Sequence, residues 1–219
     1  MLHSCEAILL DVFDLHEHDR IVTLLTGELG KVRGVARGAR RKYSRFAGSL
    51  QPLAKAKVTW FQREGRDLAR LSGVEIVRPV ERLQRDLEGI LLGSYLAGQA
   101  LEFAQENEPS DHLFRLLDST LEALLEGVDR NLAMRYFETW VLRLAGIFAP
   151  PRECPLSGRL LGPEGAAVPP SGEGLVHPSV APPGSLGVGH EALALLRRIG
   201  GESLRQLAGE RPSAGALAE

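Results

Sequence analysis

The stretch KVRGVAR at residues 31–37, followed by GARRKYSRF at residues 38–46, decides the fold class and the surface chemistry of this chain. In an extended strand, successive side chains point to opposite faces. Val32, Gly34 and Ala36 would therefore share one face, which suits a core, and the cations of residues 31–37 would share the other. The glycine and the run of cations that follow indicate an exposed connection. The stretch therefore predicts a strand that leads into a basic loop.

Four other short segments around this stretch have the composition of strands. They are apolar, β-branched or alternating, and they cover residues 5–12, 20–25, 54–61 and 68–77. Residues 26–30 and 63–66 have turn chemistry, and the second of these turns would close a hairpin. Five strands in about eighty residues, with the longest connection between the third and the fourth, predict a small OB-type barrel. A compact SH3-like barrel is also compatible with this spacing.

After residue 80 the hydrophobic period becomes helical, with apolar residues recurring every three or four positions. We expect helices from Leu83 to Ala104, from Ser110 to Leu124 and from Asp129 to Ile147, packed as a bundle. The residues expected to face inward are Leu83, Leu87, Ile90, Ala97, Leu101 and Ala104 in the first helix, Leu113, Leu117, Leu121 and Leu124 in the second, and Ala133, Phe137, Trp140, Leu144 and Ile147 in the third.

The C-terminal part changes character again. Residues 150–189 contain nine of the 13 prolines, so they cannot hold a long helix or a central strand. Taken together, the patterns predict an α+β fold with five parts: an OB-fold nucleic-acid-binding domain at residues 1–80, a helical domain at 81–148, a Pro/Gly-rich segment at 149–189, a C-terminal helix at 190–208 that returns to the helical domain, and a flexible tail at 209–219.

The charge distribution is the most informative feature for function. The net charge is only −2, yet residues 31–63 hold ten basic residues and no acidic one. Such a run attracts polyanions, and aromatic residues within it offer surfaces for unpaired bases. The candidate phosphate contacts are Lys31, Arg33, Arg37, Arg40, Arg41, Lys42, Arg45, Lys55 and Lys57, and the candidate base-stacking residues are Tyr43, Phe46 and Phe61. The alternative is a solvated basic face that pairs with acidic residues such as Glu81, Asp86 and Glu88.

Two further functional hypotheses belong to other classes. His16, His18 and Asp19 could hold a metal ion in a metal-dependent phosphoesterase, although an exposed polar loop explains the same residues. The basic face could also belong to an adaptor that binds an acidic protein tail in place of DNA.

Several classes of protein are disfavoured by what the sequence lacks. Two cysteines cannot form a disulfide framework, which favours a reducing compartment. The apolar run at residues 89–101 is too short to span a bilayer, and early acidic residues interrupt any signal-peptide pattern. The P-loop, G-x-S-x-G and H-E-x-x-H motifs do not occur. We therefore expect a cytoplasmic binding module with no catalytic residues, no cofactor and no membrane partner.

Three segments resemble the hallmark segments of the bacterial RecO family of DNA repair proteins. They are DRIVTLLT at residues 19–26, GKVRGVARGARR at 30–41 and SRFAGSLQP at 44–52. The resemblance implies an N-terminal OB-fold, a helical domain and a zinc-finger-like insertion. It also implies a non-enzymatic recombination mediator, which binds single- and double-stranded DNA, anneals complementary strands, and acts with RecR to load RecA onto strands coated by single-strand-binding protein.

The sequence departs from this family at the insertion. The resemblance implies two C-x-x-C pairs there, and Cys154 matches the first ligand while Ser157, His177 and Val180 stand where the others are expected. A hydroxyl and an isopropyl group do not replace thiolates, so we expect no tightly bound zinc, with Cys154 and His177 as remnants. The apolar residues expected to hold the segment in its place are Leu156, Leu160, Leu161, Val168, Leu175 and Val176.

Overall fold

The computed structural model of the chain describes residues 1–63, 65, 68–148, 150–172, 174–210 and 212–218. These residues form two compact units, residues 1–126 and residues 127–219. The turn predicted at residues 63–66 includes Glu64 and Arg66, which lie outside the described residues.

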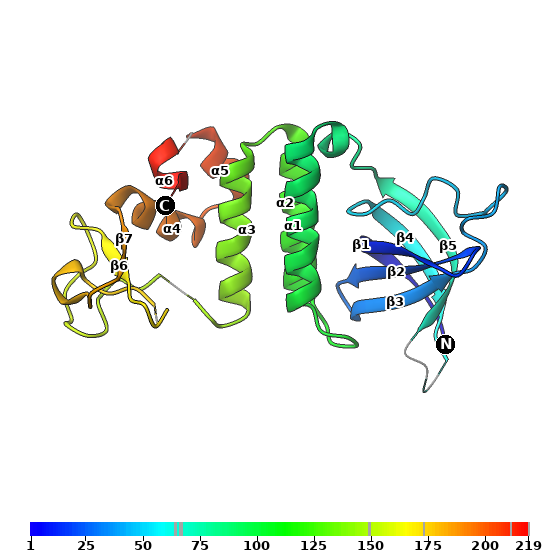
Figure 1. Cartoon of the computed structure of the whole chain (residues 1–219), viewed down its shortest axis with the longest axis horizontal. Helices are drawn as coiled ribbons and strands as arrows, with labels where there is room; N and C mark the ends of the chain where they lie inside the picture. Colours follow the sequence, from blue (N-terminus) through cyan, green and yellow to red (C-terminus); the bar gives the residue numbers. More distant parts are fainter. Residues whose placement is uncertain (64, 66–67, 149, 173, 211, 219) are drawn as a thin grey trace. The chain divides into compact units, whose positions relative to one another are not determined.

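The first unit begins with a closed five-stranded barrel (Figure 1). Its strands are β1 (Leu2–Leu15), β2 (Asp19–Thr26), β3 (Gly30–Ala36), β4 (Lys55–Phe61) and β5 (Ala69–Arg78), in the order β1-β2-β3-β5-β4. The first half of β1 pairs with β4 and its second half pairs with β2, while a short parallel pairing of β3 with β5 completes the ring. The α+β fold with an OB-like five-stranded sheet first, as predicted from the sequence, is confirmed.

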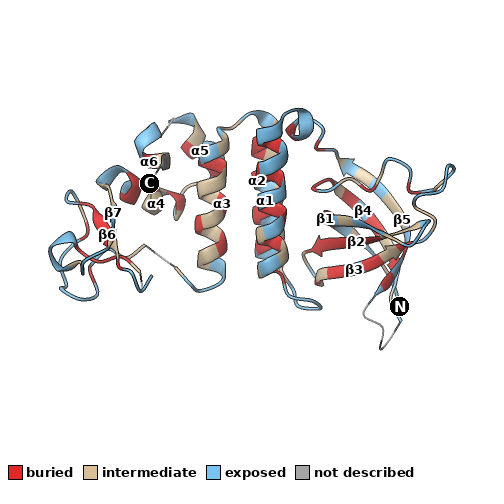
Figure 2. Cartoon of the chain, in the orientation of Figure 1, coloured by how far each residue is buried: buried red, intermediate tan, exposed pale blue. Residues whose placement is uncertain are grey.

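Buried and exposed side chains alternate along the strands, and the buried ones form the barrel core (Figure 2). In β3, Val32, Gly34 and Ala36 are buried, as their spacing predicts. In β4, the inward residues include Val58 and Trp60. A Cβ atom at Gly34 would lie 3.2 Å from the Leu71 side chain. A glycine at this position therefore lets β3 approach β5 closely.

A 3₁₀ turn (η1, Leu83–Arg85) and two helices, α1 (Leu87–Phe103) and α2 (Asp111–Glu126), complete the first unit. The prediction of which residues in this region are buried was right for Leu83, Ala97 and Ala104 but wrong for the first turn of α1. Leu87 is 71% exposed and Ile90 is also exposed, whereas Leu92, Leu96 and Ala100 are buried. Because α1 is apolar on most sides, several stripes fit a three-to-four spacing, and the packing against the barrel selects one of them.

The second unit starts with α3 (Arg130–Leu144) and ends with α4 (His190–Ile199), α5 (Leu204–Gly209) and α6 (Ala214–Ala218). Phe137 is fully buried as expected, but Leu144 and Ile147 are exposed because α3 ends at Leu144. Residues 214–218, expected to belong to a flexible tail, form α6, and Arg135 of α3 donates a hydrogen bond to the Leu217 carbonyl. Among the described residues, no helix is long and apolar enough to cross a membrane.

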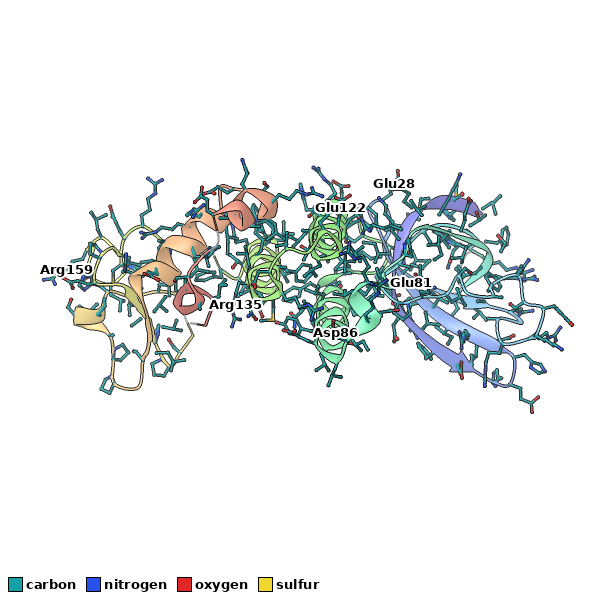
Figure 3. The ribbon with its side chains drawn as sticks, turned by 90° about the horizontal axis from the view of Figure 1, so that it is seen from above. Glu28, Glu81, Asp86, Glu122, Arg135 and Arg159 are labelled. Atoms are coloured by element: carbon teal, nitrogen blue, oxygen red, sulfur yellow. The ribbon has the colours of Figure 1, made fainter. Side chains whose placement is uncertain are left out.

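The Pro/Gly-rich segment has little regular structure, as predicted. It contains β6 (Ala166–Val168) paired with β7 (Leu186–Val188), and a 3₁₀ turn (η2, Pro178–Val180). Its small core joins Cys154, Leu161, Ala166, Ala167, Leu175 and Val176 to Leu193 of α4. Leu156 and Leu160, which the sequence places in this core, are both about 70% exposed. Figure 3 labels Arg159 on this segment and Arg135 on α3.

Candidate nucleic-acid interface

The ends of the barrel differ in charge. At one end, the β2–β3 turn meets the loop between α1 and α2, where the Ser110 N–H donates to the Gly27 carbonyl. Residues 81–126, which include both helices, carry ten acidic and three basic residues, and Glu81, Asp86 and Glu122 are labelled in Figure 3. The other end holds the β1–β2 turn and residues 37–46, here called the basic connection. A polyanion would be attracted to this second end.

Strand β3 and the residue directly after it supply two cations to that region. Arg33 and Arg37 are exposed, while the alternate residues of β3 are buried. Neither arginine forms an ion pair with any described residue. Their guanidinium groups are therefore available to a ligand, as the alternation in the sequence predicts.

The basic connection presents three more unpaired cations, Arg41, Lys42 and Arg45, none of which forms an ion pair with a described residue. Tyr43 between them is 89% exposed, and the Lys42 ammonium lies 5.6 Å from its ring centre. Phe46 is only 2% exposed and belongs to the barrel core. Phe46 is therefore a core residue that anchors the end of the connection, and it is not accessible to a base.

Arg40 also has a different role from the one its sequence position suggests. Its backbone N–H donates to the His18 carbonyl at 3.0 Å, and its guanidinium lies 3.3 Å from Asp14. Asp14 also contacts Arg20 at 3.1 Å. Arg40 therefore fastens the basic connection to the β1–β2 turn, and its charge is partly neutralised there.

Two lysines in the candidate set are occupied by partners from the helices. The Lys31 ammonium donates to the Leu101 carbonyl near the end of α1, where a cation is favourable. The Lys55 ammonium lies 2.9 Å from Glu6 and 3.0 Å from Asp118 of α2. Burial of this side chain, which is 17% exposed, lowers the pKa of Lys55, but the hydrogen bonds and charges of Glu6 and Asp118 together raise that pKa above its usual value. Lys55 thus joins the barrel to α2.

Lys57 forms no ion pair with a described residue, but its cross-strand neighbours are both acidic. In the register of the barrel it lies opposite Glu6 of β1 and opposite Glu75 of β5. Residues directly opposite one another on neighbouring strands lie within about 5.5 Å. The field at Lys57 is therefore much less positive than the field at the basic connection.

Arg70 is a basic residue that sequence reasoning missed. It is exposed on β5, opposite Val35 of β3 and opposite Phe61 of β4. Phe61 is 44% exposed, so an accessible aromatic ring and an accessible guanidinium are adjacent on the open face of the sheet. The turn predicted at residues 63–66 would have placed Phe61 opposite Leu68, so the sequence carried no direct signal for this pair.

The stretch that suggested a metal site has other contacts. The Asp19 carboxylate accepts the Gly38 N–H at 2.7 Å, and His16 adopts a positive φ of 56° in the β1–β2 turn. Among the described residues, no group of three or more His, Cys, Asp or Glu side chains could hold a metal ion. The turn is therefore a structural partner of the basic connection.

Comparisons with known families cover almost the whole chain. The family model described as "Recombination protein O N terminal" matches residues 1–80, and the one described as "Recombination protein O C terminal" matches residues 84–219. The chain belongs to the RecO family. The boundary between the two RecO matches falls directly after the barrel.

Three relatives named "DNA repair protein RecO" illustrate the similarity. The protein of Anaeromyxobacter sp. (strain K) is 40% identical over 76% of the chain, which spans 65% of that relative's length. The protein of Anaeromyxobacter sp. (strain Fw109-5) is 36% identical over 90% of the chain and 78% of its own length. The protein of Geobacter metallireducens is 43% identical over 64% of the chain and 57% of its own length.

The zinc site implied by the resemblance to RecO proteins does not fit the residues present. His177 is 5% exposed, and both of its ring nitrogens are engaged. Its Nδ1 accepts the Ser179 N–H at 3.1 Å, and its Nε2 lies 3.3 Å from the Glu164 carboxylate. A zinc ligand needs a free ring nitrogen, so coordination would break one of these contacts.

Cys154 is held by hydrogen bonds in the same region. Burial raises the pKa of its thiol, but hydrogen bonds from the Ser157 hydroxyl and from the backbone of His177, Leu156 and Ser157 lower that pKa to about 7. The bond from the His177 backbone links two parts of the segment that are distant in sequence. A sulfur that accepts several hydrogen bonds therefore lies where the resemblance to RecO proteins implies a metal ligand.

Proposed function

We propose that this chain is a non-enzymatic DNA-binding recombination mediator in DNA repair. It binds single- and double-stranded DNA and anneals complementary strands. With RecR, it helps to load RecA onto single strands that are coated by single-strand-binding protein. The site of this activity is the cytoplasm, at the nucleoid.

One observation carries the DNA-binding part of this proposal. Five cations, each without an ion pair to a described residue, gather on the outer side of β3 and on the basic connection: Arg33, Arg37, Arg41, Lys42 and Arg45. Phosphates need several cations along one path, and bases need an accessible ring. Tyr43 and Phe61 supply the rings, and Arg70 extends the path onto β5.

Fluorescence anisotropy with a labelled oligothymidine tests this proposal. The logarithm of the affinity should fall linearly with the logarithm of the salt concentration, by about 0.7 for each phosphate contact on a single strand. Affinities for oligonucleotides of mixed sequence should be similar, because the site offers few polar groups that read base edges. An affinity that does not respond to salt, or that depends strongly on sequence, would refute the proposal.

The adaptor hypothesis predicts a different competitor. If the basic connection binds an acidic protein tail, polyglutamate should displace the oligonucleotide at a comparable concentration of charge. We expect the oligonucleotide to be preferred, because exposed rings contribute to binding a base but not a carboxylate. The phosphoesterase hypothesis is not supported, because the Asp19 carboxylate is already bonded to the Gly38 N–H.

We also propose that the Pro/Gly-rich segment functions without zinc or another cofactor. The occupied ring of His177 and the absence of thiolates at Ser157 and Val180 support this. Metal analysis of protein purified without added metal should find no stoichiometric zinc, and a chelator should leave the thermal transition unchanged. The Cys154→Ser variant should keep its fold and its DNA affinity. Stoichiometric zinc, or unfolding by the chelator, would contradict the proposal.

A further inference from the structure

Acidic side chains lie directly beneath the basic connection. The Asp19 carboxylate accepts the N–H of Gly38, the second residue of the basic connection. Asp14 lies 3.1 Å from Arg20 and 3.3 Å from Arg40, so it ties β2 and the connection to the end of β1. The Arg40 N–H adds a backbone bond to the His18 carbonyl. The β1–β2 turn and the basic connection are therefore fastened together.

The hydrogen bond from Gly38 to Asp19 restrains the connection at a glycine, the residue type with the greatest backbone freedom. Gly38 has a φ of +69°, a conformation that turns the chain away from the strand direction. A hydrogen bond to a carboxylate is shorter and stronger than one between neutral groups, and the Gly38–Asp19 bond is 2.7 Å long. Asp19 therefore fixes the direction in which Arg41 and Lys42 are presented.

We propose that Asp14 and Asp19 are positioning residues for DNA binding, which hold the basic connection so that its cations meet successive phosphates. This inference rests on the proposed function. It predicts the opposite of simple electrostatics, because removing a negative charge beside a basic surface should otherwise strengthen binding to a polyanion. Here the loss of the carboxylate weakens binding, because the cations lose their arrangement.

The same turn provides a matched control. Glu17 is exposed, lies two residues from Asp19, and forms no hydrogen bond or ion pair with a described residue. Glu17→Ala removes the same charge from the same turn without touching the fastening. A further variant, Asp19→Asn, removes the charge but keeps an oxygen that can accept the Gly38 N–H.

The experiment measures affinity for labelled oligothymidine over a salt series, together with thermal unfolding. Asp19→Ala should weaken binding at least about fivefold at 0.1 M salt and make the salt slope shallower by about 0.7 for each phosphate that the protein no longer binds. Asp19→Asn should keep the affinity of the unmodified chain, and Glu17→Ala should equal it or bind slightly more tightly. If Asp19→Ala does not fold, Asp14→Ala decides, with the same expected weakening.

Tighter or unchanged binding by a folded Asp19→Ala variant would overturn the inference, as would an Asp19→Asn variant as weak as Asp19→Ala. The double variant Arg41→Ala/Lys42→Ala separates this failure from that of the proposed function. If the double variant binds DNA as well as the unmodified chain, the proposed function fails. If it binds weakly while Asp19→Ala binds normally, only the positioning role is refuted.

Discussion

The basic connection and strand β4 contain the same kinds of residue in the same acid-free run of sequence, but their surroundings differ. Arg41, Lys42 and Arg45 of the connection have no ion pair to a described residue. In β4, Lys55 is paired with Glu6 and Asp118, and Lys57 lies opposite Glu6 and Glu75. Strand β4 is hydrogen bonded on both sides within a closed barrel, so its neighbours can compensate its charge. The connection has no such strand partners among the described residues.

This difference shows that a run of cations along the sequence does not define a binding surface. Charge compensation depends on the residues that the fold places across each strand. The cations that remain uncompensated lie on the outer side of β3 and in the connection that follows it, and they form the candidate DNA site. Substitutions in the basic connection and in β4 can therefore test this division between the two regions.

The largest effect is expected for the triple variant Arg37→Ala, Arg41→Ala and Lys42→Ala. If each residue contacts one phosphate, the salt slope should become shallower by about 2, and the affinity at 0.1 M salt should fall about a hundredfold. The free energy of unfolding should change by less than about 0.5 kcal/mol per substitution, because the side chains are exposed. Anisotropy and thermal denaturation measure the two quantities. Weakened binding together with a collapsed thermal transition would show that the connection is structural.

Lys55→Ala should have the opposite effects: it should lower the stability of the fold and leave the DNA affinity almost unchanged. It removes the contacts to Glu6 and Asp118, in a site where both Lys55 and Asp118 are less than a quarter exposed. We expect the free energy of unfolding to fall by about 1–2 kcal/mol, because Asp118 then keeps, among the described residues, only its 2.6 Å contact with Arg78. DNA affinity should stay within about twofold, after correction for any unfolded fraction. A large loss of affinity in fully folded protein would place Lys55 in the binding site.

These two variants indicate what the sequence could and could not predict. The alternation at residues 31–37 and 54–61 predicted which side chains enter the core, because a period of two depends only on the strand itself. The fate of Lys55 depends on Asp118, which is 63 positions away in the chain. The contacts of Arg40 with the β1–β2 turn, and the burial of Phe46, also depend on tertiary packing. Local patterns carry no signal for such contacts.

Arg70→Ala tests whether the site extends from the basic connection onto the sheet. Arg70 lies opposite Phe61 and Val35 on the open side of the barrel. If it contacts one phosphate, the affinity for a single strand should fall about fivefold at 0.1 M salt, with a salt slope shallower by about 0.7.

Phe61→Ala should weaken binding to single strands more than to a duplex, because only unpaired bases can stack on the ring. Equal effects on both forms of DNA would argue against stacking.

The smallest effect is expected for Lys57→Ala, and this variant tests the comparison most directly. Lys57 is exposed and unpaired among the described residues, so by exposure alone it resembles Lys42. Its positions opposite Glu6 and Glu75 should nevertheless keep phosphates away. We expect less than a twofold change in DNA affinity and no change in the salt slope, whereas Lys42→Ala should lower the affinity about fivefold at 0.1 M salt.

The Glu75→Ala variant, with and without Lys57→Ala, provides the second half of the test. Removing that carboxylate should make Lys57 a better DNA contact, so the double change Glu75→Ala/Lys57→Ala should bind more weakly than Glu75→Ala alone. If Lys57→Ala alone weakens binding as much as Lys42→Ala does, cross-strand compensation does not determine which cations bind DNA.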